Sequence, residues 1–390
     1  MTQSADILFY VQHLLGIGHL RRAAVIAKAA DQAGLSVLLV SGGMPVPGLD
    51  IGGAGFAQLP PLRAADATFS ALVDETGRPV DDAWRAARRD RLLAVFEAAR
   101  PRILLTEMFP FGRRLLRFEL MPLLEAAHAA RPRPLVVSSV RDVINRESNP
   151  VKTAWILETL RDNFDRVLVH GDPSFLTLDA SLPEASEISH MLDYTGYVAL
   201  PLPEAATDRD RGAAEVLVSI GGGAVGDPLI SAALAARPLS RLRERQWRIL
   251  AGHNLPEDRF RHYRAHAEAG VTIERARPDF PALLTRAALS ISQGGYNTMV
   301  EVLGAGAPAV VVPFSGAGEN EQALRASVLA ERGLVTVVEE AALDGPALAA
   351  GIDLALARHQ AQDRSRGIPA LDGAAKTAAH LARLLAMAAP

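Results

Sequence analysis

Ser292-Gln293-Gly294-Gly295-Tyr296-Asn297-Thr298-Met299-Val300-Glu301 is the stretch of this chain that decides its fold, and Glu321-Gln322 follows it. The pattern predicts a strand that ends near Ser292, turns through two glycines and continues as a helix. Glycines let the backbone lie close to a ligand, and the first turn of a helix presents free N–H groups and a positive dipole to phosphate. Glu301, three residues after Thr298 on the same helix face, could accept hydrogen bonds from both hydroxyls of a ribose. The stretch therefore favours a site that binds a nucleoside diphosphate without a metal ion.

Length and composition limit the remaining possibilities. The chain has 390 residues, enough for two domains with a core each, and its 49% hydrophobic and 22% charged residues are typical of a globular protein. A net charge of −3 gives no general attraction to nucleic acid. The absence of cysteine excludes disulfides, thiolate catalysis and cysteine-based metal sites. Residues 1–20 lack the basic segment and cleavage site of a secretory signal, so we expect a soluble, cytoplasmic protein.

Short apolar stretches alternate with helix-like stretches along the whole chain, which is typical of a parallel sheet covered on both faces. We predict an α/β fold with two Rossmann-like, doubly wound domains. The domains are expected at 1–200 and 213–372, with a polar, proline-containing linker at 201–212 and a terminal helix at 373–390. The predicted strands are Asp6–Gln12, Ser36–Ser41, Ile103–Glu107, Leu135–Ser139, Arg166–His170, Glu215–Ile220, Arg248–Ala251, Val271–Glu274, Ala288–Ser292, Ala309–Pro313 and Leu334–Val338. The helices predicted in the first half are Leu20–Ala33, Asp81–Ala99, Arg114–Ala130 and Val151–Phe164.

A first glycine loop, Leu15-Gly16-Ile17-Gly18-His19-Leu20-Arg21-Arg22, follows the first strand directly. A dinucleotide-binding fingerprint requires glycine where Arg21 stands, so this loop argues against NAD. His19 instead lies at the carboxyl edge of the sheet, where open α/β sheets bind ligands. A histidine there suits a base that takes a hydroxyl proton or a cation that meets phosphate. The alternative is a capping or packed histidine.

A second glycine loop, Ser219-Ile220-Gly221-Gly222-Gly223-Ala224-Val225-Gly226, has the spacing G-x-G-x-x-G after a strand. The acidic residue that dinucleotide binding requires after the next strand is missing, since Leu250-Ala251-Gly252-His253-Asn254 stands there. We therefore expect Gly222 and Gly223 to lie against a diphosphate or a sugar. A purely structural tight turn is the alternative.

Two further segments could contact other parts of a nucleotide sugar. Arg275 and Phe280 flank a loop that could bind a nucleobase through backbone groups, with either side chain closing over it. Glu321 and Gln322 open a helix after a glycine-rich turn, and an acid beside an amide offers an acceptor and a donor to sugar hydroxyls. The alternative for Glu321 is ordinary acidic capping of a helix N-terminus.

Polar clusters also follow three successive strands of the first half, at Glu107 with Arg113 and Arg114, at 138–142 and at 170–173. They suggest a second binding wall, although each alone could be a solvated loop. The helix after Gly112 combines arginines with an apolar stripe and is expected to be a solvated face over a core. Contact with a membrane surface is its alternative interpretation.

These motifs together resemble a known family. Gly295-Tyr296-Asn297-Thr298 with Glu301, followed by Glu321-Gln322 and Ala326, is similar to the donor-binding signature of the GT-B-fold glycosyltransferases. Within that fold, the pattern resembles the peptidoglycan lipid-intermediate N-acetylglucosaminyltransferase group and the plant-type UDP-glucosyltransferases. The loop with His19 resembles the amino-terminal loop of the first group, and the whole chain fits a bacterial "predicted glycosyltransferase" type. The resemblance implies two domains facing across a cleft.

The resemblance also implies a role for each motif residue. Glu301 would bind the donor ribose, and Glu321 with Gln322 would hold the donor sugar. His19 would lie by the acceptor hydroxyl or the phosphates. The residues expected to bind the donor are Gly18, Gly222, Gly223, Arg275, Phe280, Gln293, Gly294, Gly295, Asn297, Thr298, Glu301, Glu321 and Gln322.

The chain departs from the family's pattern at three points. Gln293 stands where plant-type enzymes place a phosphate-binding histidine, so neutral hydrogen bonds replace a possible charge. Arg325 replaces a familiar asparagine and could shift positive charge towards the phosphates. Retaining members of this fold resemble a pattern that has glutamate at the position of Gln293. Because this chain lacks that glutamate, the resemblance favours an inverting reaction.

We therefore expect an inverting, metal-independent sugar transferase that uses a UDP- or dTDP-linked donor as co-substrate and needs no cofactor. His19, with help from Glu107, would deprotonate the acceptor hydroxyl. The expected partners are the nucleotide-sugar donor and an acceptor, which is a sugar, a lipid-linked compound or a small molecule. No nucleic-acid partner is expected. Weak peripheral contact with the inner face of the membrane is left open. One alternative is a nucleotide-sugar hydrolase or 2-epimerase on the same fold, and another is a non-catalytic binding subunit. One type of hydrolase has a similar loop with an arginine, as at Arg22.

Overall fold

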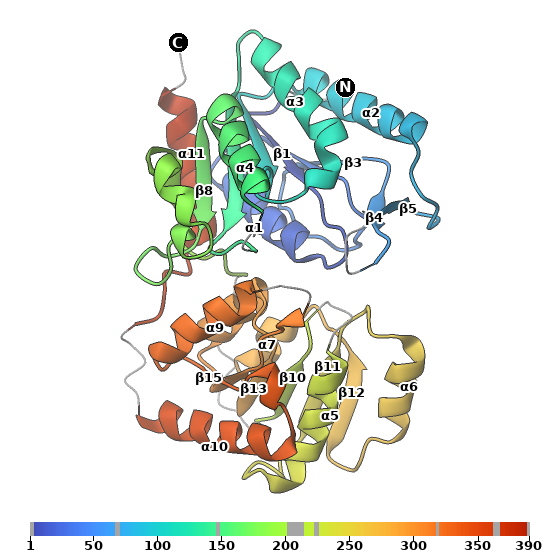
Figure 1. The fold of residues 1–390 in the computed structure, drawn as a ribbon, viewed down its shortest axis with the longest axis vertical. Helices are drawn as coiled ribbons and strands as arrows, with labels where there is room; N and C mark the ends of the chain where they lie inside the picture. Colours follow the sequence, from blue (N-terminus) through green and yellow to red (C-terminus); the bar gives the residue numbers. More distant parts are fainter. Residues whose placement is uncertain are drawn as a thin grey trace. The chain divides into compact units, whose positions relative to one another are not determined.

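The computed structural model describes residues 4–66, 71–145, 149–200, 214–221, 226–316, 320–361 and 367–387. The chain forms two compact units, the first made of Met1–Val198 with Ala370–Pro390 and the second of Ala199–Pro369 (Figure 1). The predicted linker, 201–212, lies outside the described residues.

Among the described residues, the N-terminal unit has a seven-stranded sheet in the order β3-β2-β1-β6-β7-β8-β9, and all its strand pairs are parallel. The chain moves outward from β1 in one direction first and in the other direction afterwards, so the switch point lies between β1 and β6. The strands are β1 (Ile7–Val11), β2 (Val37–Ser41), β3 (Gly55–Gln58), β6 (Ile103–Glu107), β7 (Leu135–Arg141), β8 (Arg166–His170) and β9 (Leu192–Tyr194). A separate hairpin joins β4 (Leu62–Ala64) to β5 (Leu72–Asp74).

Helices cover both faces of this sheet because its strands are apolar on both sides. Along β1, Leu8 and Tyr10 belong to a core with α2 (Asp82–Ala99), α3 (Arg117–Ala129) and α4 (Pro150–Asn163). Ile7 and Phe9 belong to the core on the other face, with α1 (Gly18–Gln32) and α11 (Gly373–Met387). The terminal helix thus completes the N-terminal unit (Figure 1).

The C-terminal unit repeats this architecture with a six-stranded parallel sheet among its described residues, in the order β12-β11-β10-β13-β14-β15. Its switch point lies between β10 and β13. The strands are β10 (Val216–Ser219), β11 (Trp247–Ala251), β12 (Val271–Arg275), β13 (Leu289–Ser292), β14 (Ala309–Val311) and β15 (Thr336–Val337). The helices are α5 (Asp227–Ala236), α6 (Glu257–Ala265), α7 (Phe280–Leu284), α8 (Tyr296–Ala305), α9 (Glu321–Glu331) and α10 (Gly345–Ala361). The predicted fold class, two doubly wound parallel-sheet domains, is confirmed.

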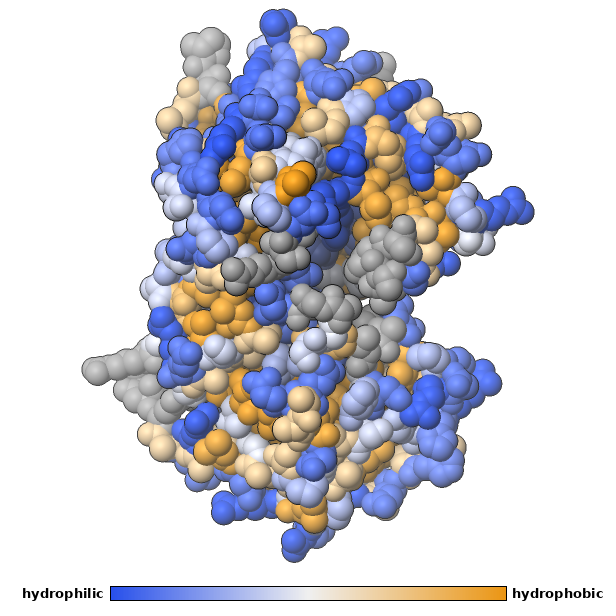
Figure 2. All heavy atoms as spheres, viewed as in Figure 1, coloured by the Kyte–Doolittle hydropathy of each residue, from blue (hydrophilic) through white to orange (hydrophobic). Residues whose placement is uncertain are grey.

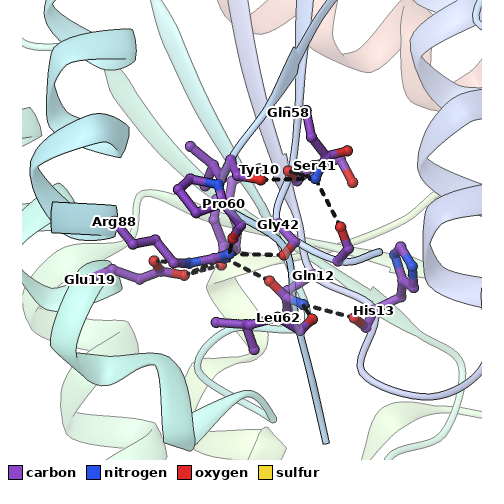
Figure 3. A network of polar contacts seen from close by, with 12 residues as sticks. Tyr10, Gln12, His13, Ser41, Gly42, Gln58, Pro60, Leu62, Arg88 and Glu119 are labelled. Carbon is purple, nitrogen blue, oxygen red and sulfur yellow. Dashed lines mark hydrogen bonds and ion pairs between the residues drawn. The ribbon is translucent and has the colours of Figure 1, made fainter. Parts of the chain in front are cut away.

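A buried ion pair joins α2 to α3 in the N-terminal unit (Figure 3). The Arg88 guanidinium donates from Nε to Glu119 Oε2 at 2.7 Å and from Nη2 to Glu119 Oε1 at 3.0 Å, and both side chains are completely buried. It also donates to Gln12 Oε1 at 2.8 Å and to the carbonyl oxygens of Gly42, at 2.9 Å, and of Pro60. Arg88 therefore ties the loops after β1 and β2 to the helical layer.

Candidate active site

His19 and Glu107 meet at the switch point of the N-terminal sheet. His19 is the second residue of α1, directly after the β1 loop, and Glu107 is the last residue of β6. Their Nδ1 and Oε1 atoms lie 2.9 Å apart. The His19 side chain is 16% exposed and that of Glu107 is completely buried, so only the histidine can reach a ligand from outside. The structure thus brings the two predicted catalytic residues together.

The surroundings of this pair keep the histidine neutral and the carboxylate charged. Burial lowers the pKa of His19 well below its usual 6.5, and the positive charge of Arg113 acts in the same direction, against the hydrogen bond that His19 donates to Glu107. Burial raises the pKa of Glu107, but the charge of Arg22 and the hydrogen bond from His19 outweigh it and lower that pKa overall. An ionised carboxylate can only accept a hydrogen bond, so we assign the proton of neutral His19 to Nδ1. Nε2 then carries the lone pair that can accept a proton.

Arg22, one turn further along α1, supplies the charge that balances Glu107. Its Nη2 contacts Glu107 Oε1 and lies 3.3 Å from His19 Nδ1. A second arginine, Arg113, donates from Nε to the carbonyl of Gln12 at 2.8 Å. Burial lowers the Arg113 pKa to about 10, and the nearby charge of Arg141 acts in the same direction. Arg22, Arg113 and Arg141 thus place positive charge around the buried carboxylate of Glu107 and its partner His19.

Two members of the polar clusters predicted at the carboxyl ends of β7 and β8 join this pair. Ser139 Oγ donates to Glu107 Oε2 at 2.6 Å and lies 2.8 Å from His170 Nε2. Neither residue is among the predicted site residues. The signal that could have identified them is a buried serine and a buried histidine at neighbouring strand ends, because buried polar groups need partners.

The glycine turn of the C-terminal unit lies where the sequence predicts it. β13 ends at Ser292 and α8 begins at Tyr296, with Gly295 as its N-cap and no side-chain capping bond. A Cβ added at Gly295 would meet no atom of the described residues within 4 Å, so none of them crowds the N-cap of α8. A Cβ at Gly294 would lie 3.1 Å from the carbonyl oxygen of Gln322. Gly294 is therefore required for the close approach of the α9 segment.

The two halves of the opening motif are thus joined in space. Arg325 Nη1 donates to the Gly294 carbonyl at 3.0 Å, and its Nη2 lies 3.7 Å from Glu321 Oε1. Gln322 Oε1 accepts from the Phe314 backbone N–H at 3.2 Å. The Gln293 side chain lies beside the end of β10, since a Cβ at Gly221 would lie 3.8 Å from its Oε1. The buried Arg325 guanidinium is thus engaged with the turn itself.

The remaining predicted donor residues differ in how accessible they are. Asn297 and Thr298 are half-buried in the first turn of α8. Glu301 is only 6% exposed and Glu321 only 2%. The predicted contact of Glu301 with the ribose and that of Glu321 with the donor sugar therefore stay predictions. Gly222 and Gly223 lie outside the described residues, and Gly18 is the first residue of α1.

Arg275 and Phe280 are packed within the C-terminal unit. Arg275 Nη1 donates to the carbonyls of Gly252 and Leu255, both at 2.9 Å, and its guanidinium lies 4.1 Å from the Phe260 ring centroid. Phe280 opens α7 and is 8% exposed. Their predicted closing over a nucleobase stays a prediction, and Arg275 has an observed structural role in holding the loop after β11.

The helix predicted at Arg114–Ala130 begins as a 3-10 turn and continues as α3. Hydrophilic and hydrophobic residues are mixed over the face shown in Figure 2. Leu116 and Leu120 are buried and Arg117 is exposed, which fits a solvated helix over a core. Leu115 is 42% exposed. Within the described part of the chain, no helix has the length and apolar character needed to cross a bilayer.

Comparison with known proteins finds a family model that matches part of the chain. Residues 216–381 match the glycosyltransferase family 28 C-terminal domain. Among curated relatives, the UDP-N-acetylglucosamine--N-acetylmuramyl-(pentapeptide) pyrophosphoryl-undecaprenol N-acetylglucosamine transferase of Ralstonia nicotianae is 31% identical over 209 residues, which are 51% of this chain and 55% of that protein. The enzyme of the same name from Gloeobacter violaceus is 32% identical over 124 residues, 27% of this chain and 34% of that protein. The chain thus spans between a third and just over half of these relatives.

Solved glycosyltransferases have the same fold over nearly the whole chain. The calicheamicin glycosyltransferase CalG4 superposes with a TM-score of 0.65 at 16% identity, covering 99% of this chain and 100% of that one. MurG of Acinetobacter baumannii superposes with a TM-score of 0.57 at 16% identity, covering 98% and 99%. The resemblance to GT-B glycosyltransferases of the peptidoglycan N-acetylglucosaminyltransferase group is confirmed.

Proposed function

We propose that the whole chain is a glycosyltransferase, because residues 216–381 match the glycosyltransferase family 28 C-terminal domain. It moves a sugar from a UDP- or dTDP-linked donor to an acceptor hydroxyl. The observation that carries this proposal is the His19–Glu107 pair at 2.9 Å, a polarised base on a glycosyltransferase fold. The names of the curated relatives favour UDP-N-acetylglucosamine as donor and a lipid-linked acceptor.

In the proposed reaction, His19 Nε2 takes the proton of the acceptor hydroxyl. The acceptor oxygen attacks the anomeric carbon from the side opposite the nucleotide, and the bond from that carbon to the diphosphate oxygen breaks. Glu107 stabilises the imidazolium that forms, because it already binds Nδ1–H. The departing diphosphate would gain hydrogen bonds at the N-terminus of α8, next to Gly295. Inversion, metal independence and the absence of a cofactor are parts of this proposal.

The C-terminal turn supports the donor side of the proposal. The N-cap at Gly295 and the half-buried Asn297 and Thr298 offer backbone and side-chain donors to a diphosphate. Gln322 and the buried Glu321 lie against that turn, where a donor sugar would extend from the phosphates. Peripheral contact with the inner face of the membrane would accompany a lipid-linked acceptor.

A nucleotide-sugar hydrolase is the second candidate, because the contact of Arg22 with Glu107 ties the arginine of the loop to the base. Incubation with UDP-N-acetylglucosamine, UDP-glucose and dTDP-glucose separates the two activities. We expect release of nucleoside diphosphate only when a membrane extract supplies acceptors. Free sugar released without the extract would favour hydrolysis, and no release from any donor would contradict both.

The role of His19 is tested by His19→Ala. Turnover should fall by about 10²–10⁴-fold while UDP affinity stays the same, because the base acts on the acceptor proton. The exposed His190 provides the matched control, and His190→Ala should retain wild-type turnover. Wild-type turnover in His19→Ala would refute the assignment of the base.

A further inference from the structure

We propose that Ser139, His170 and Thr195 are positioning residues that fix the orientation and charge of Glu107 through a buried hydrogen-bond chain. Their catalytic effect on His19 rests on the proposed function, whereas the chain itself is a property of the N-terminal unit alone.

The chain runs across the sheet from β6 through β7 and β8 to the residue that follows β9. Glu107 in β6 stands opposite Ser139 in β7, and Ser139 Oγ lies 2.6 Å from Glu107 Oε2. His170 ends β8, and its Nε2 lies 2.8 Å from Ser139 Oγ. Thr195 follows β9, and its Oγ1 lies 2.8 Å from His170 Nδ1. These residues are at most 3% exposed, so water cannot replace the contacts.

The chemistry of the four groups sets one direction for the hydrogen bonds. The ionised Glu107 accepts at both oxygens, so the Ser139 hydroxyl donates to it. Ser139 Oγ must then accept from His170, which places the His170 proton on Nε2. His170 Nδ1 accepts in turn from the hydroxyl of Thr195. Burial lowers the pKa of His170 to about 3, and the positive charge of Arg22 also lowers it. The negative charge of Glu107 raises this pKa but does not outweigh the other two effects, so the ring stays neutral.

This direction couples the chain to the base. Oε1 of Glu107 binds His19 and Arg22, and Oε2 binds Ser139. If the Ser139 hydroxyl is removed, part of the carboxylate charge is no longer balanced by a hydrogen bond. That charge then attracts the proton on His19 more strongly, against the opposing charges of Arg22, Arg113 and Arg141. A merely structural serine would leave the titration of His19 unchanged.

Histidine-selective ¹⁵N NMR of the full-length protein tests the proposal without any sugar donor. His19→Gln and His170→Gln assign the two rings by loss of their signals. We expect wild-type His170 to be neutral with its proton on Nε2 down to about pH 5. We expect Ser139→Ala to raise the pKa of His19 by about one unit, and Ser139→Thr to restore the wild-type value.

Ser138 provides the matched control, because it is equally buried on the same strand and donates to the carbonyl of Phe109 at 2.8 Å. Ser138→Ala should leave the pKa of His19 unchanged. A wild-type His170 with its proton on Nδ1 overturns the proposal, even if Ser139→Ala fails to fold. An equal His19 pKa in folded Ser139→Ala and wild type also overturns it. These readouts need no turnover. They can therefore support the hydrogen-bond chain even if the protein transfers no sugar, and they can contradict the chain even if it does.

Discussion

Replacement of Arg88 by methionine should destabilise the N-terminal unit strongly. Methionine keeps much of the side-chain volume but removes every hydrogen bond of the guanidinium. Glu119 would keep a contact with the Tyr10 hydroxyl, at 2.6 Å, but would lose its buried counter-ion. The carbonyl of Gly42 and the Gln12 amide oxygen would lose their bonds to Arg88 as well.

The size of the effect follows from the charge left behind. Removing one partner of a buried ion pair typically costs about 3–5 kcal/mol, because the remaining charge is uncompensated. For a unit of this size each kcal/mol lowers the melting temperature by about 2–4 °C, so we expect a decrease of about 6–20 °C. Differential scanning calorimetry measures this directly on the transition of the N-terminal unit.

Arg89 gives a matched control on the same helix. Its ion pair with Asp90 is solvent-exposed, with side chains 38% and 63% exposed, so Arg89→Met should change the melting temperature little. The double variant Arg88→Met with Glu119→Leu should recover part of the loss, because it no longer leaves a buried charge unpaired. An Arg88→Met protein that melts within about 2 °C of the Arg89→Met control would refute the reasoning.

Three further predictions concern the glycine turn, pH and the donor. Gly294→Ala should destabilise the C-terminal unit by about 1–3 kcal/mol, because the new Cβ would lie 3.1 Å from a carbonyl oxygen, whereas Gly295→Ala should be nearly neutral in urea unfolding. In the folded protein, burial lowers the pKa of His13 to about 4 and that of His170 to about 3, so the unfolded chain binds more protons below about pH 6.5. When the pH falls from 7 to 5, the contribution of each histidine should therefore lower the free energy of unfolding by about 2 kcal/mol. A urea midpoint that does not change with pH would contradict this. Glu301→Ala should weaken UDP binding in calorimetry of the folded variant, and unchanged affinity would remove its ribose role.

Most strands can be predicted from the sequence because each is a short apolar run between turn signals. β1 and β6 are completely buried, and their predicted bounds differ from the observed ones by at most one residue. β3 and β9 lack such a signal, since they lie at the edges of the sheet and their residues are half-buried or exposed. Edge strands bury less surface, so their sequences are less constrained.

The meeting of His19 with Glu107 follows from topology, because both stand at carboxyl ends on either side of a switch point. The direction in which a long side chain turns does not follow from the sequence. Arg275 could have reached outward from its strand end, but it turns towards the carbonyls of Gly252 and Leu255. Tertiary hydrogen bonds decide such cases, and residue order does not encode them locally.

The position of α11 has a consequence for synthesis on the ribosome. Ala378, Leu381, Leu384 and Leu385 fill the core beneath β1, although they are translated after the entire C-terminal unit. The first sheet is translated early, but one of its apolar faces stays incompletely covered until α11 has been translated. The N-terminal unit should therefore complete its native packing only after the C-terminal unit has been translated.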